Sequence, residues 1–67
     1  MPKHGDIIII HTKRGVRPGL GLIRSGVPLR LDRAKDRGSF RFTDIETGSS
    51  CDWPAWSLDS VRWSHAR

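Results

Sequence analysis

The segment from Phe40 to Trp63 constrains the fold most, because its alternating residues are broken at intervals by turn formers. Phe40 and Phe42 flank a single arginine, an alternation that predicts a strand with one face in a core. Gly48 closes a turn, and the next strand stops at Pro54, which lacks the N–H that a sheet interior needs. A short helical turn and a final strand complete the segment. This ending is typical of a very small closed β-barrel.

Four consecutive isoleucines near the N-terminus predict another strand, because β-branched residues favour extended structure over helix. Ile7 and Ile9 face one way and Ile8 and Ile10 the other, so both faces need cover. One face is expected in the core. The other is expected under a loop, under the C-terminal segment or against a second subunit, with Ile8 and Ile10 as the candidate interface residues.

We therefore predict one all-β domain over residues 1–67, a five-stranded SH3-like barrel with one short 3-10 turn before the last strand. Strands are expected near 6–13, 20–25, 27–32, 39–46 and 50–54, and a short closing strand at 61–63 is an alternative member of the barrel. The 3-10 turn is expected at 57–60, with Leu58 plugging the barrel's end. Fraying is expected at 1–4 and 64–67.

Length and composition limit the size of the core and the cellular compartment. A 67-residue chain buries only about 60 % of its surface on folding, so its stability is expected to come from a tightly packed barrel or from an oligomer. The single cysteine, Cys51, cannot form an internal disulfide, which indicates a reducing compartment such as the cytoplasm. No apolar run approaches the roughly 20 residues of a membrane span, so no membrane partner is expected.

Basic residues dominate the N-terminal part of the chain. Twelve Lys and Arg against seven Asp and Glu give a net charge of +5, and ten of the twelve lie within residues 1–41. This polarity favours an anionic partner, either nucleic acid or an acidic protein surface. Solubility alone is the competing explanation.

Glycine-flanked basic residues and exposed tryptophan are the features expected to bind such a partner. Small glycines let backbone N–H groups approach a phosphate, and an indole stacks on a base. The candidate contacts are Lys13, Arg14, Arg17, Arg24, Arg41, Trp53 and Trp56. The charged tip at 32–39 also holds Arg33, Lys35 and Arg37, but its interleaved aspartates favour a solvated hairpin there.

Catalytic and metal chemistry have weak support in the sequence. The spacing of its three histidines and Cys51 matches no zinc finger, ribbon or HExxH pattern, and nothing places a histidine beside Cys51. We expect no enzyme activity, no metal and no cofactor.

In pattern, nearly the whole chain resembles the SH3-like small-barrel superfamily, in which five short strands close on themselves and a 3-10 turn separates the last two. That resemblance implies a binder of RNA, DNA or peptides. The ending is also similar to type II dihydrofolate reductase, whose site lies in a pore between subunits. Trp53 stands at its tyrosine position, and Pro54, Leu58, Asp59 and Val61 follow at matching spacing. The pore positions carry Ser50, Cys51 and Asp52, which departs from the enzyme's pattern.

The leading hypothesis is accordingly a non-catalytic, small basic binding module. The alternatives are an oligomeric small barrel with a site between subunits, and a small inhibitor of a host enzyme from a mobile element.

Overall fold

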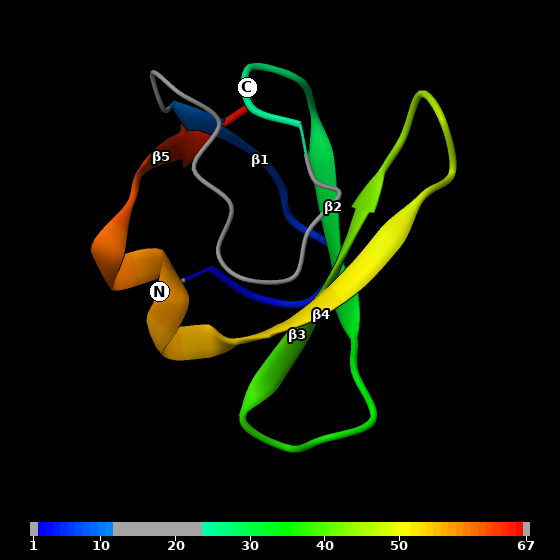
Figure 1. Ribbon diagram of the computed structural model, residues 1–67, viewed down its shortest axis with the longest axis vertical. Coiled ribbons are helices and arrows are strands. Elements are labelled where there is room, and N and C mark those ends of the chain that lie inside the picture. The colour runs from blue at the N-terminus through cyan, green and yellow to red at the C-terminus, as the bar shows by residue number, and fades with distance from the viewer. Residues whose placement is uncertain (1, 12–23, 67) are drawn as a thin grey trace.

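A single five-stranded antiparallel sheet is the main element of the structure. The computed structural model describes residues 2–11 and 24–66, and the strands within them are β1 (Ile7–His11), β2 (Leu29–Arg33), β3 (Ser39–Asp44), β4 (Ser50–Pro54) and β5 (Arg62–His65). A 3-10 helix, η1 (Ala55–Ser60), connects β4 to β5 (Figure 1). The predicted all-β fold with a short 3-10 element before the last strand is confirmed.

The strand order is β4-β3-β2-β1-β5, so β2 runs between the pair β1–β5 and the pair β3–β4 (Figure 1). Among the residues that the structure describes, β4 and β5 are the two edges of the sheet and no pairing joins them. The strand expected at 20–25 falls largely outside the described residues, and Arg24 and Ser25 lie in no strand. The C-terminal strand is the fifth member of the sheet.

The core lies on one face of this sheet. Alternate residues of β1, β2 and β3 point into it, and Trp53 of β4 packs on Phe42 with 4.8 Å between ring centroids. Leu58 of η1 is 2 % exposed, as expected for a residue that closes one end of the core. The buried apolar residues are Ile8, Ile10, Leu29, Leu31, Phe40, Phe42, Trp53 and Leu58.

Ile8 and Ile10 belong to this core, with exposed fractions of 0 % and 3 %, instead of to an interface between subunits. The cause is strand register, because Ile8 pairs with Leu29 and both side chains face inward. Ile7, at 38 % exposed, and Ile9 form the outward face of β1.

The chain ends extend further into the sheet than expected. β5 continues through His65, and the backbone N–H of Ala66 donates to the carbonyl oxygen of Ile7 at 2.9 Å. Near the N-terminus, the N–H of Gly5 donates to the carbonyl oxygen of Leu31 at 2.7 Å. Residues 64–66 are thus held in the sheet rather than frayed beyond it. No helix in the described ranges is long and apolar enough to cross a bilayer.

Candidate anion-binding surface

The outer face of β2, β3 and β4 carries alternating charges that neutralise one another. Arg30 binds Asp32 at 2.8 Å and Arg41 binds Asp52 at 2.7 Å, each through a second guanidinium nitrogen as well. The Thr43 hydroxyl also donates to Asp32 at 2.8 Å. Hydrogen bonds from the two arginines are the main cause that lowers the pKa values of the two carboxyls. The face is polar but has little excess charge.

Arg24 is engaged in the same way at the β3–β4 turn. Its guanidinium binds Asp44 at 2.8 Å and Glu46 at 2.9 Å. Asp44 is buried and also accepts backbone N–H bonds from Glu46 and Thr47. Its pKa is lowered, first by the hydrogen bond from Arg24. Two of the predicted anion contacts, Arg24 and Arg41, therefore already hold carboxylates.

The β2–β3 hairpin is different. Within residues 2–11 and 24–66, no salt bridge engages Arg33, Lys35 or Arg37. Arg33 lies two residues after the buried Leu31 in β2, and alternate residues of a strand point to the same face of the sheet. The Arg33 side chain therefore continues the inner face of β2 beyond the end of the core. The Asp32 side chain points to the outer face, where Arg30 binds it, so it does not neutralise Arg33.

The N-terminal segment lies against this hairpin. The His4 ring packs edge-on against Phe40, with centroids 5.3 Å apart, and Phe40 is the cross-strand partner of Arg33. Between the two segments is a pocket of about 340 Å³. We call it the hairpin pocket; its lining residues are His4, Arg33, Ala34, Lys35, Asp36, Arg37 and Ser39.

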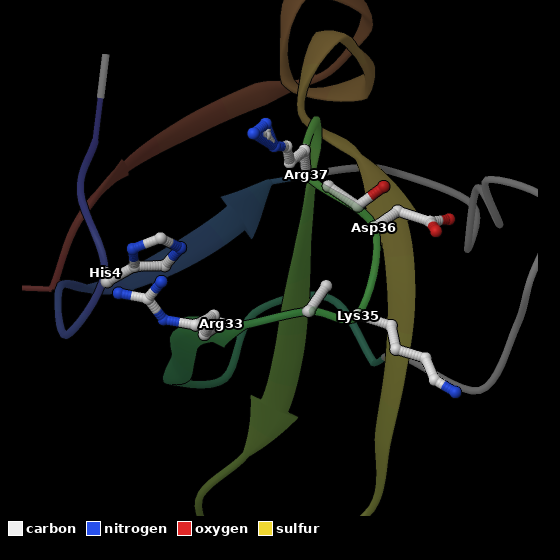
Figure 2. Close-up of a pocket in the computed structure, with 7 residues that line it drawn as sticks. His4, Arg33, Lys35, Asp36 and Arg37 are labelled. Carbon is white, nitrogen blue, oxygen red and sulfur yellow. The ribbon is translucent and has the colours of Figure 1, made fainter.

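Side-chain directions divide the lining into two groups. Figure 2 shows His4, Arg33 and Arg37 on one side of the hairpin backbone, whereas Lys35 and Asp36 extend to the other. In agreement, the charge of Lys35 is a minor cause, after the hydrogen bond from Arg41, of the lowered pKa of Asp52 on the outer face. The side of the pocket that carries the two arginines is therefore cationic.

The three tryptophans have three environments. Trp53 is 1 % exposed, so it belongs to the core and not to a binding surface. Trp63 is half-buried against the core. Trp56 is 67 % exposed, and the N–H of the preceding residue, Ala55, donates to the carbonyl oxygen of Gly38 at 2.8 Å. That bond brings the start of η1, the helix that carries Trp56, to the hairpin that carries Arg33 and Arg37.

Lys13, Arg14 and Arg17, the predicted loop contacts, lie outside the described residues. The hairpin pocket was missed in the sequence because its arginines alternate with aspartates along the chain. Strand parity was the signal that separates them, since Asp32 and Arg33 face opposite sides of the sheet.

Groups for catalysis are sparse in the described part of the chain. No three His, Cys, Asp or Glu side chains there come together as a metal site would require. Burial raises the pKa of the Cys51 thiol, which opposes its use as a nucleophile. His11 Nε2 lies 2.8 Å from Ser64 Oγ, but both residues are exposed, and no carboxylate of the described residues hydrogen-bonds that histidine.

The fold defines a small five-stranded antiparallel β-sheet domain. Comparisons with protein families, with curated protein sequences and with solved structures gave no match for this chain.

Proposed function

We propose that this protein is a non-catalytic binding module of SH3-like small-barrel architecture that engages nucleic acid. Five short antiparallel strands, with a 3-10 helix between the last two, support the architecture. The binding surface would consist of the hairpin pocket and Trp56. Lys13, Arg14 and Arg17 remain predicted contributors to the same field.

The observation that carries the proposal is the uneven neutralisation of charge. On the sheet's outer face and at the β3–β4 turn, Arg24, Arg30 and Arg41 all bind carboxylates. At the hairpin, Arg33 and Arg37 have no such partner among the described residues. Unneutralised guanidinium groups attract phosphates, and each contact releases condensed counterions from the nucleic acid.

The exposed indole favours nucleic acid over an acidic protein surface. Every unpaired base presents a flat face to an aromatic ring, and stacking contributes about 1–3 kcal/mol per base. An acidic protein surface would complement the arginines, but Trp56 would need a separate apolar pocket on that partner. A single strand is the expected form, because bases within a duplex are already stacked on each other.

Binding of a single-stranded oligonucleotide, measured by fluorescence anisotropy at low salt, tests this proposal. Trp56→Ala is expected to weaken binding by about 1–3 kcal/mol through the loss of one stacked base. The matched control is Ile45→Ala, which removes another exposed apolar side chain, 44 % exposed, from the β3–β4 turn.

The outcomes separate the hypotheses. Equal losses in the two variants would contradict a stacking role for Trp56. Absence of oligonucleotide binding at low salt, together with binding of an acidic peptide, would replace nucleic acid with a protein partner.

A further inference from the structure

We infer that the hairpin pocket holds the terminal phosphomonoester of a nucleic acid strand, so that the protein recognises strand ends. This inference rests on the proposed function and specifies its ligand. It follows from the number, direction and surroundings of the cationic groups at the pocket.

Charge matching favours a terminal over an internal phosphate. An internal phosphodiester carries one negative charge, whereas a phosphomonoester carries about −1.5 to −2 at neutral pH and presents three acceptor oxygens. Arg33 and Arg37 bring two permanent positive charges to the same side of the hairpin (Figure 2). Guanidinium groups also donate two parallel hydrogen bonds to phosphate oxygens, which suits the three-oxygen end of a monoester.

Repulsion from carboxylates is weak at this side of the pocket. Asp36 is the carboxylate among the lining residues, and Figure 2 shows it extending away from His4, Arg33 and Arg37. Asp32, the aspartate that precedes Asp36 in the sequence, is held on the opposite face of the sheet by Arg30 and Thr43. A dianion would therefore meet the two guanidinium groups here, beside the His4 ring.

The size of the pocket fits one phosphate with its sugar. Its volume of about 340 Å³ lies at the small end of the range for ligand pockets, roughly 300–1,000 Å³. Its walls are preformed by the packing of His4 on Phe40 and by the turn, in which the Ser39 N–H donates to the carbonyl oxygens of Asp36 and Arg37 at 3.2 and 3.0 Å. Trp56 belongs to η1, whose first residue bonds to this hairpin, and we assign to it the base that adjoins the seated phosphate.

The test compares short single strands of one sequence that differ only at their ends: 5′-phosphate, 3′-phosphate, or hydroxyl at both. Each carries the same internal fluorophore, and dissociation constants are measured by anisotropy at one salt concentration. We expect one phosphorylated end to bind about tenfold more tightly than the hydroxyl strand, as two new charge-assisted hydrogen bonds would produce. The 5′ and 3′ arms identify which end is read.

Single substitutions test whether the preference for a phosphorylated end arises in the hairpin pocket. Arg33→Gln and Arg37→Gln should each reduce the ratio of the two dissociation constants toward one, whereas Arg62→Gln on exposed β5 makes the same charge change and should leave the ratio intact. Arg33→Lys keeps the charge but loses the planar fork, so it should lower the ratio partially.

Three results would overturn the inference or its basis. Equal affinity of wild-type protein for phosphorylated and hydroxyl strands would refute end recognition while leaving nucleic acid binding standing. A preference that persists in Arg33→Gln and Arg37→Gln would move the phosphate site elsewhere. Failure of every strand to bind at low salt would refute the proposed function itself.

Discussion

The side of the sheet on which an arginine lies decides what it binds. Arg30 and Arg41 lie on the outer face, between aspartates of the same and neighbouring strands. Arg33 follows an aspartate directly in sequence but faces the other way and has no carboxylate partner in the described ranges. The net charge shows that the protein is basic. The face of the sheet to which each arginine points shows which of these charges have no carboxylate partner and can bind a ligand.

In β1, the alternation of inward and outward side chains also predicts which isoleucines stabilise the fold. Ile8→Ala should lower the free energy of unfolding by about 2–5 kcal/mol, because Ile8 is fully buried and its loss leaves a cavity. Ile7→Ala, the neighbouring control at 38 % exposed, should cost less than about 1 kcal/mol. Urea denaturation measures both, and equal losses would contradict the assigned register.

At the level of elements, the two hairpins of β2, β3 and β4 were the most predictable part of the fold. The strand expected at 50–54 matches β4, and those expected at 27–32 and 39–46 overlap β2 and β3. Their alternation and turn residues are local signals. The pairing of β1 with β5 could not be predicted from local sequence, because it joins residues more than fifty positions apart, such as Ile8 and His65.

The β3–β4 turn depends on one glycine. Gly48 has φ of +84° and its N–H donates to the carbonyl oxygen of Asp44 at 2.8 Å. Gly48→Ala should therefore destabilise the fold by about 1–2 kcal/mol, the cost of a left-handed conformation for an L-residue. Thermal unfolding checks this change.

Gly38→Ala is the matched control, since Gly38 is not among the positive-φ glycines and an added Cβ there meets no atom within 4 Å. It should be neutral or stabilising by less than about 1 kcal/mol. A larger loss at Gly38 than at Gly48 would contradict the described turn geometries.

For the whole molecule, the bound carboxylates predict loss of stability in acid. Hydrogen bonds lower the pKa values of four aspartates, chiefly from the Lys3 backbone at Asp6 and from arginines at the others: Asp32, Asp44 and Asp52. A carboxyl with a lower pKa in the folded state adds stability above its unfolded pKa, about 3.9, and that stability is lost as the pH falls through the folded value.

Urea midpoints should therefore decrease as the pH is lowered from about 5 toward 2. Asp44→Asn should shrink this decrease, since the residue is buried and accepts bonds from Arg24 and two backbone groups. A midpoint at pH 2.5 equal to that at pH 7 would show that the ion pairs do not stabilise the fold.

The salt dependence of oligonucleotide affinity tests the central claim, that unneutralised arginines of the hairpin bind nucleic acid. For a single strand, the logarithm of the association constant should fall with the logarithm of salt concentration by about 0.7 per phosphate contact. Replacing Arg33 and Arg37 together by Gln should make the slope shallower by about 1.4, whereas Arg62→Gln should leave it unchanged. A wild-type slope near zero, or the same slope in the double variant, would contradict the claim.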